Sequence, residues 1–399
     1  MTDDTLWDPG IRGLLEHMLK VEASDLYIAA GSPPVFRIDG VGYPAKTPLT
    51  ADQIAKVAST LMTPAQRVEF SEKMELNVAL ASSTGGRFRL NVFRQRGATG
   101  MVVRLVRTKI RTLEELEMPP ILAEVMGSKR GLVLLVGGTG SGKSTTLAAM
   151  IDHRNKSSSG HIITIEDPVE FIHEHQNCIV TQREIGIDTL SVKDALKNAL
   201  RQAPDVILIG EIRDAETMES AIAFAETGHL CVSTLHSNNA NQAIERILNF
   251  FPPTRQQEIR LQLSLNLRAI VSQRLVASPS GCRAAALEIL LDTPRIRELV
   301  KRGETDTIKE AMLQGENEGC QTFDSALFTL VSQGRISPET ALQAADSAND
   351  LRLMLERLQR GTGGAAAEPV LRLVPVTPLK AVTATGPAHR ASAAAIPRR

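Results

Sequence analysis

The chain has 399 residues, and its 45 basic and 45 acidic side chains give a formal net charge of zero, which disfavours a general nucleic-acid binder. Its four cysteines lie far apart without a C-x-x-C pair, so neither a disulfide framework nor a four-cysteine zinc site is expected, and a reducing compartment fits. No apolar run approaches the roughly 20 residues that span a bilayer, and the polar N-terminus does not resemble a secretory signal, so we expect a cytoplasmic protein without direct membrane insertion.

Residues 1–111 predict an α+β domain. The expected elements are a helix over 11–20, strands over 26–28 and 35–38, a hairpin turn at Asp39-Gly40, helices over 52–62 and 64–73, and strands over 87–93 and 101–106. Residues 112–120 end in two prolines, which stop regular structure, and are expected to form a linker.

A basic segment covers residues 87–111. In Arg87–Val92, apolar and polar side chains alternate, so one face of the predicted strand is apolar and the other is cationic. The cationic face is either a solvated sheet surface or a set of arginines that meet a nucleotide bound elsewhere, on a neighbouring subunit. The basic residues are Arg87, Arg89, Arg94, Arg96, Arg104, Arg107, Lys109 and Arg111, with no acidic residue among them.

The strongest motif is a phosphate-binding loop between a strand and a helix. The apolar run Leu132–Val136 predicts a buried strand, and the residues after it fit G-x-x-x-x-G-K-[ST]. Glycines let backbone N–H groups point at phosphate oxygens, the helix adds its positive N-terminal end, Lys143 reaches the β- and γ-phosphates, and the Ser144 hydroxyl holds Mg²⁺. The predicted nucleotide-binding residues are Gly137, Gly138, Thr139, Gly140, Ser141, Gly142, Lys143, Ser144 and Thr145.

Strands alternate with helices from residue 131 to residue 235, which predicts a mostly parallel sheet with right-handed crossovers. From residue 241 to about residue 309 the pattern predicts mainly helix, broken at Phe251–Pro253 and at Ser278–Gly281. Further helices are expected from residue 323 and over 338–358. The Ala/Pro/Thr-rich composition of residues 361–399 predicts a disordered, weakly basic tail.

Acidic residues and one histidine follow the predicted parallel strands. Glu166 comes directly after one strand with Glu170 in the next turn, Glu211 follows a second strand, and His236 ends a third. Ligands bind at the carboxyl ends of strands in open parallel sheets, so we expect these four side chains to converge on the γ-phosphate. One carboxylate there would orient the attacking water, and another would hold Mg²⁺ through water.

Other histidines are less suited to this role. His229 and His236 stand at opposite ends of one strand, about 23 Å apart at roughly 3.3 Å per residue, so both cannot touch the same phosphate. His229 is therefore expected in a structural position or at a subunit contact. His173 and His175 resemble a metal pair only superficially, and an exposed loop is preferred for them.

Four sequence boxes resemble those of the secretion-superfamily hexameric ATPases. They are GGTGSGKSTT, TIEDPVEF, RQAPDVILIGEIRD and TGHLCVSTLHSNNA, and they match the phosphate loop, acidic box, second nucleotide-binding strand and histidine box. ASDLYIAAGSPPVFRIDG and RFRLNVFRQRG resemble the N-terminal domain of type IV pilus retraction motors, the PilT/PilU family. Those of the PilT type carry an AIRNLIREG segment, whereas Arg295–Gly303 reads RIRELVKRG here. With GCQTFDSALF and AADSANDLRL, the chain thus looks more like the accessory, PilU-type branch.

The resemblance implies roles for residues that match the family's motifs. Lys143 and Ser144 match the phosphate loop. Ser144 and Glu211 are implied as Mg²⁺ ligands, with Glu211 bound either directly or through a water molecule. The family's general base most resembles Glu170, with Glu166 the other candidate. His229 and His236 match the histidine box, which also places His229 among the nucleotide-binding residues. Arg89 and Arg104 match the N-domain arginines that reach the nucleotide.

The implied architecture is an N-terminal PAS-like domain over 1–111, a linker over 112–120, a RecA-like ATPase core over 121–290, a helical part over 291–360 and the tail 361–399. The implied protein is a homohexamer that uses ATP and Mg²⁺ and passes force to an inner-membrane pilus platform protein, with a PilT-type ATPase as partner. The alternatives are a nucleic-acid or secretion motor of the same fold and an ATP-binding adaptor with little turnover. Zero net charge disfavours a nucleic-acid partner.

Overall fold

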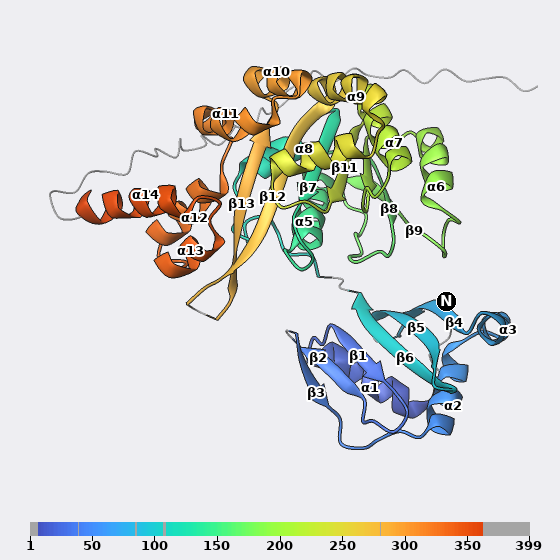
Figure 1. The fold of residues 1–399 in the computed structure, drawn as a ribbon. Coiled ribbons are helices and arrows are strands. Elements are labelled where there is room, and N and C mark those ends of the chain that lie inside the picture. Colours follow the sequence, from blue (N-terminus) through green and yellow to red (C-terminus); the bar gives the residue numbers. More distant parts are fainter. Residues whose placement is uncertain (1–6, 39, 84–85, 107–108, 280, 362–399) are drawn as a thin grey trace, which may run out of the picture.

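The structure is a computed structural model that describes residues 7–38, 40–83, 86–106, 109–279 and 281–361. Within these residues the strands form two separate sheets, one N-terminal and one central to the rest of the chain (Figure 1). Most of the predicted tail 361–399, from residue 362 on, lies outside the described residues, as do Asp39 of the predicted hairpin turn and Arg107 of the basic segment.

The N-terminal sheet is antiparallel throughout its described strands, in the order β3-β2-β1-β6-β5-β4. The strands β4 and β5 alternate buried and more exposed residues because one face of the sheet is covered, by the first three helices. The elements are α1 (Pro9–Lys20), β1 (Asp25–Ile28), β2 (Val35–Ile38), β3 (Val41–Pro44), α2 (Ala51–Leu61), α3 (Pro64–Lys73), β4 (Glu75–Ala81), β5 (Arg87–Gln95) and β6 (Ala98–Val106).

The second sheet has the order β13-β12-β7-β11-β10-β8-β9 in the described chain. All neighbouring strands are parallel except β13, which runs antiparallel to β12. The mostly parallel sheet predicted from the alternating pattern is therefore present. Its elements are α4 (Ile121–Met126), β7 (Gly131–Val136), α5 (Lys143–Ser157), β8 (Gly160–Glu166), β9 (Cys178–Glu184), α6 (Val192–Ala199), β10 (Val206–Ile209), α7 (Ala215–Glu226), β11 (Leu230–Leu235), α8 (Ala240–Asn249), α9 (Pro253–Asn266), β12 (Leu267–Ala277) and β13 (Arg283–Leu291).

Helices cover both faces of this sheet, which explains the uniformly apolar sequence of its central strands. Every residue of β7, β10 and β11 is buried. Alternate β7 residues point to opposite faces: Leu132 and Leu134 pack with residues of α6 to α11, whereas Val133 and Leu135 pack with residues of α4 and α5. The carboxyl ends of these parallel strands are thereby held at one edge between two helical layers.

The mainly helical pattern expected over residues 241–309 is wrong for Leu267–Leu291. The structure has the β12–β13 hairpin there, and the predicted break at Ser278–Gly281, of which Ser280 lies outside the described residues, falls between its two strands. Most residues of both strands are buried, so neither strand shows the two-residue alternation that marks a half-exposed strand. Pairing with β7 outweighs the local preference of leucine and alanine for helix.

Beyond β13 the described chain is helical up to residue 361. The helices α12 to α14 pack on the hairpin through a small core that contains Val276, Ala286 and Phe323. Figure 1 shows them grouped on the β13 side of the sheet. Among the described residues, no helix has the length and apolar character needed to cross a bilayer. The remaining elements are α10 (Pro294–Arg302), α11 (Ile308–Gln314), α12 (Phe323–Ser332), α13 (Pro338–Ala344), α14 (Ala348–Gly361) and the short 3₁₀ helices Leu200–Gln202, Thr305–Thr307 and Glu316–Glu318.

Candidate active site

One cavity of about 360 Å³ opens at the carboxyl ends of β8, β10 and β11, next to the start of α5. Six of the side chains singled out in the sequence line it, as do Thr139 and Gly140 of the phosphate loop. This is the convergence expected from the order of the strands. The six are Lys143, Ser144, Glu166, Glu170, Glu211 and His236.

The phosphate loop runs from the end of β7 to the start of α5 and depends on glycine. Gly137, Gly140 and Gly142 have φ values of 154°, 78° and 90°, in the region that favours glycine. A Cβ atom on Gly137 would lie 2.5 Å from Ser141 Oγ and 2.7 Å from the carbonyl oxygen of Gln273. The loop is therefore a tight backbone turn at the N-terminus of a 15-residue helix.

Lys143 is folded back onto this loop. Its Nζ donates to the carbonyl oxygens of Gly137 at 2.8 Å and Gly138 at 2.9 Å. Burial lowers the pKa of Lys143, and the carboxylates of Glu211 and Glu170 oppose that shift. The Ser141 hydroxyl is buried in the same turn and has no hydrogen-bond partner among the residues that the structure describes. A glycine cradle, a lysine and a helix N-terminus fit the phosphates of a nucleotide, and the oxygens of Ser144 and Glu211 fit Mg²⁺.

Glu166 and Glu170 line the cavity in different environments. Glu166 ends β8, and its Oε1 accepts hydrogen bonds from Thr164 Oγ1 at 2.6 Å and Gln182 Nε2 at 3.3 Å. Burial raises the pKa of Glu166 to about 7, and those hydrogen bonds oppose the rise. Glu170 is exposed. Glu166 thus has a proton affinity suited to exchange near neutral pH, whereas Glu170 is open to water.

Glu211 and His236 meet at the cavity. Glu211 follows β10, His236 follows β11, and His236 Nε2 lies 3.2 Å from Glu211 Oε1. Arg213 Nε lies 2.7 Å from the other oxygen, Glu211 Oε2, and Arg213 also lines the cavity. Arg213 was not among the residues predicted from the sequence, although its place two residues after Glu211, beyond a buried strand, is the signal that marks it.

Gln273 is a second residue that the sequence analysis missed. It is buried in β12 directly behind the phosphate loop, where its Oε1 accepts a hydrogen bond of 2.8 Å from Thr146 Oγ1 on α5. A Cβ atom on Gly142 would lie 2.7 Å from Gln273 Nε2. Because residues 267–277 were expected to be helical, no signal in the sequence could place Gln273 there.

His229 lies away from the cavity, whereas His173 lies beside it. His229 stands before β11, contacts Thr227 Oγ1 through Nδ1 at 3.0 Å, and does not line the cavity, so its assignment to nucleotide binding is not supported within this chain. The exposed loop preferred for His173 is wrong: its side chain is buried beside the cavity, and burial lowers its pKa to about 4. His175 is exposed, and no group of three or more potential metal ligands occurs in the described residues.

Arg89 and Arg104 lie opposite each other on β5 and β6 and do not line this cavity. Arg104 Nε is held 2.9 Å from the buried Asp25 Oδ1, yet 62% of its side chain is exposed. Arg89 Nη2 lies 3.9 Å from Oδ1 of Asp167, the residue after Glu166. The structure therefore places one predicted arginine beside the acidic box and leaves the other accessible from outside the chain.

Comparisons with known proteins show the family of this chain. Residues 2–336 match the family described as Type II/IV secretion system protein. The chain is 54% identical over 345 residues to the type IV pilus ATPase PilU of Pseudomonas aeruginosa, covering 86% of this chain and 90% of PilU. It is 42% identical over 339 residues to the type IV pilus retraction ATPase PilT of that organism, covering 84% of this chain and 98% of PilT.

The fold agrees as well. A crystal structure of the pilus retraction motor PilT with bound ADP matches with a TM-score of 0.80 and 39% identity, covering 86% of this chain and 99% of that one. High identity, near-complete coverage of both relatives and the shared fold agree with one another. The chain therefore belongs to the Type II/IV secretion system protein family and, within it, to the PilT/PilU group of type IV pilus ATPases.

Proposed function

We propose that this chain hydrolyses ATP as a motor for type IV pilus retraction, and hence for twitching motility. The observation that carries the proposal is the single cavity that brings the phosphate-loop residues Lys143 and Ser144 together with Glu170, Glu211 and His236. The relatives are described as a type IV pilus ATPase, a retraction ATPase and, in Neisseria gonorrhoeae, a twitching motility protein that is 38% identical over 320 residues.

The cavity residues that the sequence singled out each have a part in hydrolysis. The loop N–H groups and Lys143 bind the β- and γ-phosphates, and Ser144 with Glu211 would hold Mg²⁺, which neutralises charge that develops on the transferred phosphoryl group. Glu170, exposed to solvent, orients the attacking water and accepts its proton, and the less exposed Glu166 is the alternative base. His236, in contact with Glu211, responds to the γ-phosphate.

Arg89 and Arg104 take part in the reaction when the chain is assembled as a homohexamer. An arginine that approaches a nucleotide when domains close stabilises charge in the transition state and links hydrolysis to movement. The exposed position of Arg104 supports action on the nucleotide of a neighbouring subunit. His229 is assigned to a structural position or to a subunit contact. The domains in this proposal are PAS-like over 1–111, a linker over 112–120, a RecA-like core over 121–290, a helical part over 291–360 and the tail 361–399.

The motor has the accessory, PilU-type role and works with a PilT-type ATPase on an inner-membrane platform protein, at the cytoplasmic side of the pilus base. The segment that departs from the PilT-type motif, Arg295–Gly303, forms α10, which buries Ile296, Leu299 and Val300 against the core. The hydrolysis cavity includes no residue of α10, so a force-delivering surface can change while the site is retained.

ATPase activity measured with and without single-stranded DNA tests this function. The proposal predicts turnover that DNA does not stimulate. Stimulation by DNA would instead favour a nucleic-acid motor, and binding of ATP without measurable turnover would favour an adaptor.

A further inference from the structure

The segment Ser237–Asn239 joins His236 to α8, and two residues outside the cavity hold it. The backbone N–H of Ala240, the first residue of α8, donates to Glu288 Oε1 at 2.7 Å. The carbonyl oxygen of Asn238 accepts from Arg274 Nη2 at 3.4 Å. Glu288 and Arg274 belong to β13 and β12, so the hairpin that the sequence did not predict is the support of this segment.

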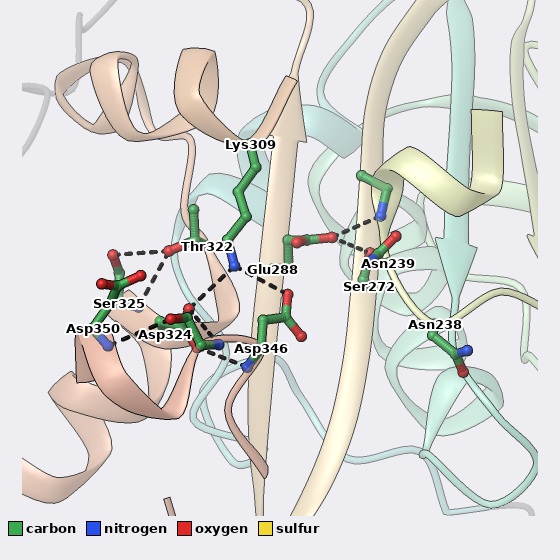
Figure 2. Close-up of polar contacts among 12 residues, drawn as sticks. Asn238, Asn239, Ser272, Glu288, Lys309, Thr322, Asp324, Ser325, Asp346 and Asp350 are labelled. Carbon is green, nitrogen blue, oxygen red and sulfur yellow. Dashed lines mark hydrogen bonds and ion pairs between the residues drawn. The ribbon is translucent and has the colours of Figure 1, made fainter. Parts of the chain in front are cut away.

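Glu288 is a buried anchor. It is 3% exposed and lies opposite Ser272, whose Oγ donates to the same Oε1 at 2.9 Å. Figure 2 shows the Glu288 carboxylate reaching across from β13 toward Ser272 and the start of α8. A carboxylate is favoured at this place because it accepts from the N-terminal end of a helix. The start of α8 is thereby fixed to the sheet.

Arg274 extends the connection to the C-terminal helices. Its Nη2 lies 2.7 Å from Asp346 Oδ1, its Nη1 donates to the carbonyl oxygen of Ala344 at 2.8 Å, and its guanidinium lies 3.8 Å from the centre of the Phe323 ring. A planar guanidinium can hold several acceptors and an aromatic face in one orientation. Arg274 therefore joins the segment after His236 to α12 and to the connection between α13 and α14.

Asp346 in turn ties three helical elements together. Lys309 Nζ, on α11, lies 3.5 Å from Asp346 Oδ2 and 3.2 Å from Asp324 Oδ2 on α12. The backbone N–H of Asp346 donates to Asp324 Oδ1 at 2.9 Å. Figure 2 shows these charged side chains converging between the helices, close to Glu288. A displacement of the C-terminal helices would therefore also displace the Arg274 side chain.

We propose that Arg274 and Glu288 are positioning residues that set His236 against Glu211 according to the placement of the C-terminal helices. The inference rests on the proposed function, which gives His236 its role. Neither Arg274 nor Glu288 lines the cavity, so both act through the short segment Ser237–Asn239. A misplacement of about 1 Å at a reacting centre can slow turnover roughly a hundredfold, so this support bears on the rate.

Steady-state ATP hydrolysis by the assembled full-length protein tests the inference, with Arg274→Gln compared with Arg268→Gln. Arg268 is a matched control because it also lies on β12 and pairs with an aspartate, Asp292, at 2.8 Å, but at the opposite end of the strand. We expect Arg274→Gln to lower kcat roughly tenfold with KM for ATP changed by less than about twofold, and Arg268→Gln to keep both. An unchanged kcat in Arg274→Gln overturns the inference.

The same substitution in a His236→Ala background separates this inference from the proposed function. If Arg274 acts through His236, Arg274→Gln slows the wild type but adds less than about twofold to the loss in His236→Ala. A full tenfold further loss overturns the inference alone. Wild-type turnover in His236→Ala overturns the role of His236 in the proposed function and the inference with it.

Asp346→Asn is a second variant that keeps the side-chain shape while removing the charge that faces Arg274. It is expected to lower kcat in the same direction, without changing the mass of the assembled particle or its unfolding temperature by more than a few degrees. If Arg274→Gln does not assemble, the kcat of Asp346→Asn tests the positioning role of Arg274 in its place. A purely structural role predicts the reverse pattern, a lower unfolding temperature with unchanged kcat per folded subunit.

Discussion

His236 Nε2 lies 3.2 Å from Glu211 Oε1, so residues that follow two neighbouring parallel strands meet at the mouth of the cavity that Lys143 also lines. Arg213 holds the other oxygen of Glu211 at 2.7 Å. A carboxylate between an imidazole and a guanidinium is oriented before any nucleotide binds. A change at one member of this group is therefore expected to alter the others.

Lys143→Ala is expected to reduce ATP hydrolysis by roughly a hundredfold or more, because the phosphates lose the loop cation while the glycine turn remains. The measurement is phosphate release by monodisperse protein. The control is Lys129→Ala, which removes an exposed lysine before β7. Wild-type turnover in folded Lys143→Ala protein would refute the assignment of the nucleotide site.

Glu211→Ala and Glu170→Ala are expected to lower kcat by roughly a hundredfold each while changing ATP affinity by much less, because both act on metal, water or transition-state charge. Glu216→Ala is the matched control, since Glu216 is an exposed carboxylate on α7 paired with Lys193. Separate measurements of kcat and of nucleotide affinity check the prediction. If either variant only weakened binding, the role given to that residue would be wrong.

The variants Arg104→Ala and Lys143→Ala, combined in one ring, test whether Arg104 acts across a subunit interface. Rings mixed from Arg104→Ala and Lys143→Ala subunits should regain part of the activity, because some interfaces then join an intact arginine to an intact phosphate loop. Rings made from either variant alone are the controls. No recovery, under confirmed co-assembly, would mean that Arg104 acts within its own subunit or not at all.

The raised pKa of Glu166 predicts that the free energy of unfolding depends on pH. Its pKa is about 7 in the folded protein, above its ordinary value of 4.5, because burial disfavours the charged form. The folded state therefore holds the proton more tightly, so this contribution to stability is fully present below about pH 4.5 and is lost as the pH rises through 7. The neutral variant Glu166→Gln has no such proton to lose.

Denaturant unfolding of the nucleotide-free protein at pH 5 and pH 8 measures this effect. Relative to Glu166→Gln, the wild type should lose on the order of 3 kcal/mol between the two pH values. The comparison between variants is needed because the buried His173, with its lowered pKa, contributes a slope of opposite sign at acid pH. Glu174→Gln, an exposed carboxyl, is the control. Parallel pH profiles for wild type and Glu166→Gln would contradict the prediction.

The sequence was sufficient to place the residues that follow strands at one edge of the parallel sheet. The motif at Gly137–Ser144 and the apolar strands before Glu166, Glu211 and His236 predict their meeting, because parallel strands end at a common edge. Arg104 could be placed beside Arg89 for a similar reason, since the two strands pair directly. These relationships depend on strand order and periodicity alone.

The support behind the site could not be predicted in this way. The strands β12 and β13 are mostly buried and rich in leucine and alanine, so their local sequence does not distinguish strand from helix. Pairing of β12 with β7 and of β13 with β12 decides the outcome, and with it the positions of Gln273, Arg274 and Glu288. The burial of His173 likewise depends on tertiary packing that no local pattern records.

The most direct test of the proposed motor is pilus retraction in cells that contain this protein together with a catalytically inactive PilT-type ATPase, compared with cells that contain this protein alone. The account predicts retraction in the first strain and little in the second, with Lys143→Ala abolishing it in both. Full retraction by this protein alone would contradict the accessory role, and no retraction beside the inactive partner would contradict the claim that this chain supplies the hydrolysis.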